Sequence, residues 1–338
     1  MITEPGHRRR ALGLLAASAC LLLPLLVTAG AAPAATGFVV PAWAYPGNPP
    51  AGTTPSPATV DESPLHLPGS EAAYTRAEVK DLFAPPDWYP DDHPPMPEVV
   101  AHGRKPSVYA CAYCHLPDGS GRPENAPVAG LPAEYIVQQV RDMASGARHS
   151  AWDGPYRPSD LMRQVAENAR AADIAEAAAY FSSLRVARRV EVVEAERVPV
   201  THAAGWLYAR TEGAGDEPLG ERIVEVSRDP ERHELRDSRN GAIAYVPPGS
   251  IARGGQLAVS GAGGRTLPCG SCHGADLRGV GLTPPIAGRS PTYLLRQLLA
   301  FRTGTRSTPA GQPMQAVVAR LELNDMISVA AYVGSREP

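Results

Sequence analysis

The pattern Cys-x-x-Cys-His occurs twice in this chain of 338 residues, at positions 111–115 and 269–273. In such a pattern the two thiols form thioether bonds to a porphyrin, and the histidine becomes a ligand of the haem iron. The two motifs use four of the five cysteines. The sequence therefore predicts two covalently bound haem c groups. The predicted attachment residues are Cys111, Cys114, Cys269 and Cys272.

The first 35 residues have the pattern of an export signal. Arg8, Arg9 and Arg10 form a basic region, the apolar run 11–30 follows, and small residues come next. This pattern predicts a signal peptide over 1–35 and a periplasmic location. The alternative is that residues 11–30 remain as a membrane anchor and hold the protein at the membrane. Isolated cysteine pairs in an oxidising compartment form disulfides, but a histidine directly after each pair favours haem.

The sequence behind the first motif repeats behind the second at a constant offset of 158 residues. The shared pattern Tyr-x-x-x-Gln-x-x-x-x-x-x-Gly-x-Arg starts at Tyr135 and again at Tyr293. After Arg148 the register shifts by six residues, because the first copy has an extra loop around 150–156. So long a match in register is not expected by chance, and it predicts two copies of one structural unit.

Each copy is predicted to be mainly helical. Apolar residues recur at helical intervals, and Gly146 and Gly304 end the longest runs. The expected N-caps are Asp173, Asn324 or Asp325, and Ser250, because their side chains accept hydrogen bonds from free backbone N–H groups. The expected helices are 97–102, 133–145 and 173–184 in the first copy, and 250–260, 291–303 and 324–333 in the second.

The segments outside the two copies have a different composition. Branched apolar residues at 189–193 and 222–226 predict strands, and the glycines and prolines between them predict turns. Residues 36–70 are rich in proline, alanine, threonine and serine, so we expect them to be extended or disordered. A short helix is predicted within 71–83, and the aromatic pair 88–89 is expected to clasp the first copy.

The motif histidines, His115 and His273, are the predicted first ligands of the two irons. The second ligand must come from a distant residue, and Met162 and Met314 stand at matching places in the two copies. A methionine thioether is a soft, neutral donor that favours ferrous iron and raises the reduction potential. We predict these two methionines as second ligands, with His149 as the rival for the first iron.

Two further repeated pairs are candidates for a supporting role. Pro127 and Pro285 each lie twelve residues after a motif histidine. We expect a backbone carbonyl in that loop to accept the hydrogen of the second imidazole nitrogen; the alternative is a plain turn. Arg148 and Arg306 could pair with haem carboxylates, because a guanidinium binds a carboxylate bidentately. The alternative is a solvated arginine at a helix end.

These motifs together resemble a class I cytochrome c. Cys-x-x-Cys-His, Pro-x-x-Gly, Tyr-x-x-x-Gln, Gly-x-Arg and a methionine before a helix ending in Ala-Ala-Tyr follow one another in both copies. Two copies in tandem resemble the dihaem periplasmic cytochromes c of bacteria. The resemblance implies a mainly α fold with two tandem cytochrome c domains joined by a small β-rich insert. The expected parts are a signal peptide (1–35), a proline-rich segment with a short helix (36–95), the first domain (96–186), the connecting segment (187–247) and the second domain (248–338).

The resemblance implies electron transfer without bond-making chemistry. We therefore predict an electron carrier without catalytic residues, working between a donor dehydrogenase or quinol-oxidising complex and an oxidase or other terminal acceptor. The alternatives are a cytochrome subunit docked on a dehydrogenase and a dihaem enzyme such as a peroxidase, which needs one open iron position.

Zinc binding and nucleic-acid binding fit the residues less well than haem binding. Zinc bound by the four motif cysteines is an alternative to haem, but each cysteine pair has its own histidine and its own downstream methionine. Without residues 1–35 the chain has 29 basic and 34 acidic residues, a net charge of −5. This balance argues against nucleic-acid binding, which requires a concentrated positive surface.

Overall fold

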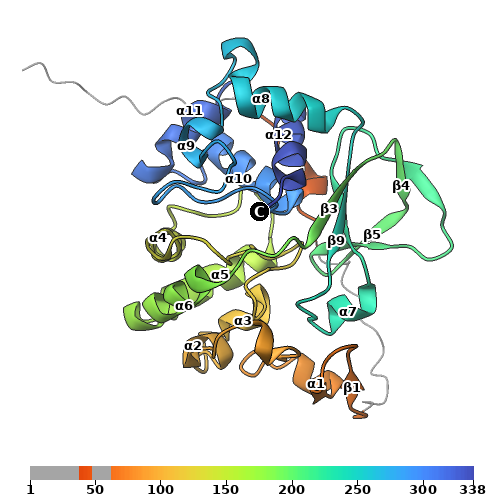
Figure 1. The fold of residues 1–338 in the computed structure, drawn as a ribbon, viewed down its shortest axis with the longest axis vertical. Coiled ribbons are helices and arrows are strands. Elements are labelled where there is room, and N and C mark those ends of the chain that lie inside the picture. The colour runs from red at the N-terminus through yellow and green to blue at the C-terminus, as the bar shows by residue number, and fades with distance from the viewer. Residues whose placement is uncertain (1–37, 48–61) are drawn as a thin grey trace, which may run out of the picture. The chain divides into compact units, whose positions relative to one another are not determined.

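A computed structural model describes residues 38–47 and 62–338 (Figure 1). The predicted signal peptide lies outside the described residues. Helices make up 40% of the structure and strands 14%, so helix is the main element. In the part of the chain that the structure describes, no helix is both long and apolar enough to cross a membrane.

The helices of the first copy surround one hydrophobic cluster. Their bounds are α2 (Glu98–Ala101), α3 (Cys111–His115), α4 (Ala133–Ala144), α5 (Arg157–Asn168) and α6 (Ala171–Ser183). α4 packs against α5 and α6, while α2 packs against α3 and α6. Val100, Ile136 and Phe181 are among the buried residues of this cluster. Burial of the apolar faces of these short helices stabilises the unit, since helices of this length are marginal in isolation.

The helices of the second copy form a larger cluster. Their bounds are α8 (Ser250–Gly264), α9 (Gly270–His273), α10 (Pro291–Thr303), η3 (Pro309–Gly311), α11 (Gln312–Val318) and α12 (Leu323–Ser335). α12 packs against α8 and α10. The approach of α8 to α12 requires glycine, because a Cβ atom at Gly254 would lie 1.9 Å from the carbonyl oxygen of Ser328. The cluster also includes Tyr45, Ala151 and Tyr156, which belong to segments outside the second copy.

All six helices predicted from the repeat are confirmed, with ends that differ by a few residues. The predicted caps are wrong in detail. The Asp173 and Asp325 carboxylates accept hydrogen bonds from the backbone N–H groups of Arg170 (3.2 Å) and Glu322 (3.0 Å), which are the true N-caps. Ser250 is the first residue of its helix and follows a glycine at the N-cap.

The connecting segment contains a five-stranded sheet in the order β3-β9-β8-β6-β5. Figure 1 labels β3, β9 and β5 of this sheet. β3 and β9 are parallel, with Val190 opposite Ala242, and β9 and β8 are antiparallel. The predicted strands at 189–193 and 222–226 correspond to β3 and β8. A separate antiparallel pair, β4 and β7, completes the strands of this segment. The bounds are β3 (Val190–Glu194), β4 (Arg197–Pro199), β5 (Thr201–Ala204), β6 (Leu207–Arg210), β7 (Asp216–Pro218), β8 (Val224–Ser227), α7 (Pro230–Glu234) and β9 (Ala242–Val246).

The N-terminal segment differs from its prediction in two respects. Within 38–47, which was expected to be extended or disordered, Ala44 and Tyr45 are buried. Trp88 packs against the connecting segment rather than the first copy, because its Nε1 donates to the carbonyl oxygen of Leu235 at 2.7 Å. The elements here are η1 (Ala42–Ala44), β1 (Leu65–His66), β2 (Ala73–Tyr74), α1 (Arg76–Val79) and η2 (Pro90–Asp92), so the predicted helix within 71–83 is only one turn long.

Candidate haem sites

The first Cys-x-x-Cys-His motif forms the short helix α3 on the wall of a cavity of about 240 Å³. Cys111, Cys114 and His115 line the cavity together with Met162 from α5. The structure therefore brings the four predicted haem residues of the first copy to one enclosure. Its apolar wall suits a flat hydrophobic ring. The wall includes Val99, Val108, Leu131, Ile136, Val140, Leu161, Val165, Ile174, Ala177 and Phe181.

The two motif histidines are held in the same way. The Nδ1 atom of His115 lies 2.8 Å from the carbonyl oxygen of Ala126, and that of His273 lies 2.8 Å from the carbonyl oxygen of Pro284. A carbonyl oxygen only accepts, so Nδ1 carries the hydrogen and Nε2 keeps its lone pair for a metal. Burial holds the pKa of both histidines below the usual value, which keeps the rings neutral. The predicted carbonyl acceptor next to Pro127 and Pro285 is confirmed.

The two candidate second ligands lie on helices that the sequence analysis did not predict. Met162 is on α5 and Met314 is on α11. Both helices contain proline in the first turn, and the loops before them differ between the two copies by six residues. Met314 and Cys269 pack against the same buried cluster, which α10 and α12 form in the second copy. His149, the rival ligand, is exposed, and its Nδ1 atom lies 3.0 Å from the carbonyl oxygen of Ser150.

The repeated glutamines and arginines meet between the two copies. The Gln139 side-chain oxygen accepts from Arg148 at 3.0 Å and from Arg306 at 2.7 Å. The Gln297 oxygen accepts from the same two arginines, at 2.9 Å and 3.3 Å. The backbones beside the arginines also pair in antiparallel fashion. Both arginines are buried, so the interpretation as solvated helix ends is wrong.

A third buried arginine, Arg296, was missed by the sequence analysis. It belongs to α10 of the second copy, yet it lines the cavity of the first. Its Nε donates to the carbonyl oxygen of Ala44 at 2.7 Å, and its Nη1 donates to that of Pro123 at 3.1 Å. Tyr45 and Tyr156 lie beside its guanidinium, 5.5 and 5.2 Å from the ring centroids. The repeat gave no signal for it, because Gln138 stands at the matching position of the first copy.

The buried arginines and the Tyr156 hydroxyl around the first cavity indicate whether a haem would fit there. Within 38–47 and 62–338, none of Arg148, Arg296 and Arg306 forms an ion pair with a carboxylate. Burial and the neighbouring Arg306 charge hold the pKa of Arg148 below its usual value. The Tyr156 hydroxyl, which faces the same cavity, is buried and lacks a hydrogen-bond partner. Buried cations and an orphaned hydroxyl need anionic acceptors, which the carboxylates of haem provide, so the residues fit this group.

A buried ion cluster on the loop after the first motif was also not predicted. The Nε of Arg122 lies 3.1 Å from a Glu124 carboxylate oxygen, and Nε2 of His233 lies 3.6 Å from the same oxygen. Burial alone would raise the pKa of Glu124, but the charges of Arg122 and His233 hold it well below its usual value. His233 belongs to α7, so the connecting segment reaches the wall of the first cavity.

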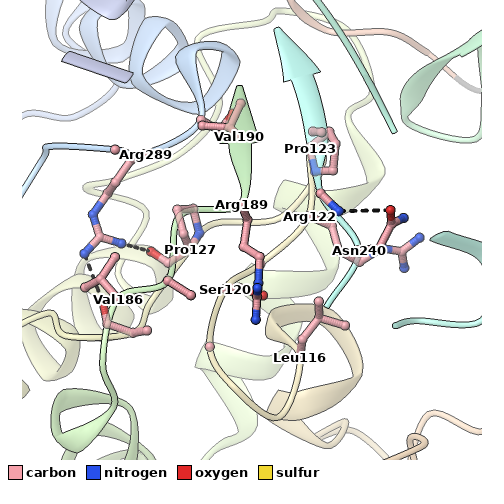
Figure 2. Close-up of a pocket in the computed structure, with 18 of the residues that line it drawn as sticks. Leu116, Ser120, Arg122, Pro123, Pro127, Val186, Arg189, Val190, Asn240 and Arg289 are labelled. Atoms are coloured by element: carbon pink, nitrogen blue, oxygen red, sulfur yellow. Dashed lines mark hydrogen bonds between the residues drawn. The ribbon is translucent and has the colours of Figure 1, made fainter. Parts of the chain in front are cut away.

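A smaller cavity of about 70 Å³ lies between the two copies and the connecting segment (Figure 2). Arg289 reaches across it from the second copy and donates to the carbonyl oxygens of Pro127 at 2.8 Å and Ala129 at 3.0 Å. No predicted haem residue lines this cavity. It belongs to the contact between the copies rather than to a haem site.

The zinc interpretation receives no support. Among the residues that the structure describes, no three His, Cys, Asp or Glu side chains come together as a metal site.

Comparison with known proteins adds a family and several relatives. The family model "Cytochrome c" matches residues 259–337. Cytochrome c4 of Azotobacter vinelandii is 26% identical over 230 residues, which are 66% of this chain and 82% of the relative. The "thiosulfate dehydrogenase electron acceptor" of Stutzerimonas stutzeri is 28% identical, with coverage of 70% and 84%. Cytochrome c-554(547) of Halothiobacillus neapolitanus is 34% identical over 85 residues, 22% of this chain and 93% of the relative.

Proposed function

Since the chain belongs to the dihaem class I cytochromes c, which carry covalently bound haem c, we propose that it is a soluble electron carrier of the bacterial periplasm. Its partners are redox proteins. We propose a dehydrogenase or a quinol-oxidising complex as donor and a terminal oxidase or reductase as acceptor. The similarity to a protein named as the electron acceptor of thiosulfate dehydrogenase favours a dehydrogenase as donor.

Two tandem haem domains, 96–186 and 248–338, would carry the two groups, with 36–95 and 187–247 as additions to them. Cys111 and Cys114 would attach the first haem and His115 and Met162 would bind its iron. The matching residues of the second domain are Cys269, Cys272, His273 and Met314. Each bound haem supplies an iron that takes up and releases one electron.

The chain's own residues have three tasks in this function. The carbonyl oxygens of Ala126 and Pro284 fix the orientation of the imidazoles and hold a hydrogen on Nδ1. The apolar wall of the first cavity excludes water, which limits the solvent reorganisation that accompanies a change of charge. The buried arginines Arg148 and Arg296, which line the first cavity, would offset the negative charge of the haem carboxylates.

The observation that carries the proposal is the gathering of Cys111, Cys114, His115 and Met162 around one apolar cavity. With His115 and Met162 both bound to it, an iron would have no open position for a substrate. A carrier therefore fits this set better than a peroxidase. A cytochrome subunit that stays docked on a dehydrogenase would use the same residues, and co-purification with a larger enzyme would identify that case.

The deciding experiment is a redox titration of the exported protein, followed by absorption spectroscopy. We expect two low-spin haems and a weak near-infrared sulfur-to-iron band. Met314→Ala and Met162→Ala should each remove about half of that band. Met143→Leu is a matched control, because Met143 lines the first cavity but aligns with a phenylalanine of the second copy. A bare polypeptide in the mass spectrum would refute the proposal, and rapid cyanide binding by one ferric haem would favour an enzyme.

A further inference from the structure

The two Cys-x-x-Cys-His motifs differ sharply in what covers them. At the first motif, the guanidinium of Arg236 lies 3.4 Å from the centroid of the Tyr113 ring and donates to the Tyr113 carbonyl oxygen at 2.5 Å. The segment before the first copy adds a second layer. The Phe83 ring packs on Tyr109 at 5.5 Å, and the Ala110 backbone donates to the carbonyl oxygen of Leu82 at 2.9 Å.

The loop after the first motif is covered as well. Glu124 is only 7% exposed, because Arg122 of the same loop and His233 of the connecting segment enclose its carboxylate. Arg236 and His233 both belong to the 187–247 segment, while Leu82 and Phe83 belong to 36–95. The two segments that lie outside the repeat therefore close the edge of the first motif from opposite ends of the sequence.

The same positions of the second copy are open. Cys272, the counterpart of the partly buried Cys114, is exposed. Leu267, Val280 and Leu282 are 60%, 62% and 62% exposed. They match Tyr109, Arg122 and Glu124 at the offset of 158 residues. Three of the five exposed large hydrophobic residues in the described part of the chain thus flank the second motif.

Two arginines next to this apolar rim (Leu267, Val280 and Leu282) in sequence have carboxylate neighbours. Arg265 forms an ion pair with Asp325, and Arg278 lies 4.0 Å from Asp276. The rim therefore offers apolar surface, and these two adjacent charges are offset. Exposed apolar surface of this kind marks a site of protein association, because a partner that covers it removes it from water.

We propose that this protein exchanges electrons with its partners through the apolar rim around Cys272, while the added segments close the first motif to them. The occupant is a redox protein that presents an uncharged, apolar surface around the edge of its own cofactor. This proposal rests on the proposed function, since Cys272 marks the edge of the second haem only if the haem is attached there. The first haem would then exchange electrons with partners by way of the second.

The test uses the full-length protein with both haems and a reduced blue-copper protein as the electron donor. Leu282→Glu and Val280→Glu place a charge on the rim, and Val39→Glu places the same charge on an exposed valine elsewhere. We expect the second-order rate of reduction to fall about tenfold for each rim variant, as for the loss of a central interface contact, and to stay unchanged for Val39→Glu. Reduction by ascorbate, a small molecule, should stay within about twofold of the original rate, since it needs no protein interface.

A second variant keeps the test decisive if the rim tolerates a charge. Arg236→Ala uncovers Tyr113 at the first motif, and it should not slow reduction by the blue-copper protein. Unchanged rates for both rim variants, or a tenfold loss for Arg236→Ala, would overturn the docking proposal. Such results in a protein with two reducible haems leave the carrier function intact, whereas absence of haem overturns the carrier function itself.

The salt dependence of the reaction gives an independent measurement. Because the rim is apolar and its arginines are paired, the rate should change less than about threefold between 0.05 and 0.5 M salt, a range over which charge-steered association falls steeply. A steep fall would show that the partner docks on a charged face instead.

Discussion

The two copies of the repeated unit have diverged through what surrounds them more than through their own helices. Residues from outside the first copy line its cavity. Tyr45 precedes the copy in sequence, and Arg296 comes from the second copy. The second copy has its own extensive core, and Cys272 of its motif is exposed. Equivalent positions consequently hold opposite kinds of residue, such as the buried Glu124 and the exposed Leu282.

The contrast shows that added segments give the two copies of a duplicated unit different surroundings. A haem attached at the first motif would lie close to a buried ion cluster and aromatic rings, which would shield it from water and from partners. A haem attached at the second motif would lie beside the apolar rim, where partners could reach it. The same local motif supplies both sites, so the assignment of tasks depends on long-range packing, as does the haem environment that sets the reduction potential.

Removal of the attachment cysteines of one copy should change the protein most. Cys111→Ala with Cys114→Ala should leave one haem, and the first cavity of about 240 Å³ would then lose its filling. At roughly 24 cal/mol per Å³ this costs up to about 6 kcal/mol of the free energy of unfolding, comparable to the whole stability of a small domain. Mass spectrometry should show one haem, and hydrogen exchange should show loss of protection in 96–186.

The matched pair, Cys269→Ala with Cys272→Ala, should also leave one haem, with only a small loss of stability in the first copy. Because α10 supplies Arg296 to the first cavity, we expect the second variant to weaken the first copy slightly, whereas the first variant leaves the second copy protected. Retention of two haems by either double variant would contradict the attachment scheme.

Substitution of Tyr45 should affect the first site alone. Tyr45 is 5% exposed, and it packs on Trp152 at 6.1 Å and on Tyr156 at 5.2 Å between ring centroids. Tyr45→Ala should lower the free energy of unfolding by about 3 kcal/mol, because it leaves a cavity beside three aromatic or cationic groups. It should also shift the spectrum and potential of one haem only.

Tyr208→Phe serves as a control, since it removes only the hydrogen bond from the Tyr208 hydroxyl to the carbonyl oxygen of Trp43. A loss of about 1 kcal/mol without a spectral change is expected there. Equal spectral shifts of both haems in Tyr45→Ala would disprove the assignment of this residue to the first cavity.

The features that sequence predicted well are those that chemistry confines to a short stretch of chain. A thioether-linked haem needs two cysteines and a histidine on one turn, and the carbonyl that holds each imidazole lies eleven residues away at Ala126 and Pro284. Helices with a clear apolar period were predicted for the same reason. The repeat then transferred each prediction from one copy to the other.

The features that sequence did not predict depend on contacts between distant segments. Arg296 has no equivalent in the first copy, and its role follows only from the packing of α10 against residues near Ala44 and Pro123. Tyr45 lies in a proline-rich stretch whose composition resembles that of a disordered segment. His233 reaches Glu124 across more than a hundred residues. Local pattern contains no information on such pairings.

The glutamine–arginine contact between the copies should contribute a smaller share of the free energy of unfolding. Gln139→Leu removes an acceptor that serves Arg148 at 3.0 Å and Arg306 at 2.7 Å, so two buried donors lose a partner. We expect a loss of about 2 kcal/mol in urea unfolding. Gln297→Leu should cost about 1 kcal/mol, because its second contact is longer at 3.3 Å. Equal losses would show that the contact is symmetric in energy, contrary to its geometry.

The smallest effect concerns pH and the start of α6. Hydrogen bonds from Arg170 and Arg104 outweigh the effect of burial and lower the pKa of Asp173 to about 2. A lowered carboxyl pKa stabilises the fold fully above the unfolded value of about 3.9, and this stabilisation is lost as the pH falls toward 2. Asp173→Asn should therefore cost about 1–2 kcal/mol at pH 7, and progressively less between pH 5 and pH 2. Urea unfolding at pH 7, 5 and 3 measures the difference, with the exposed Asp276→Asn as a neutral control.

Asp325, at the matching place in the second copy, bonds one arginine, Arg265, instead of two. Asp325→Asn should for that reason cost less than Asp173→Asn at pH 7, and the reverse order would mean that the arginines at α6 add nothing to the capping of the helix.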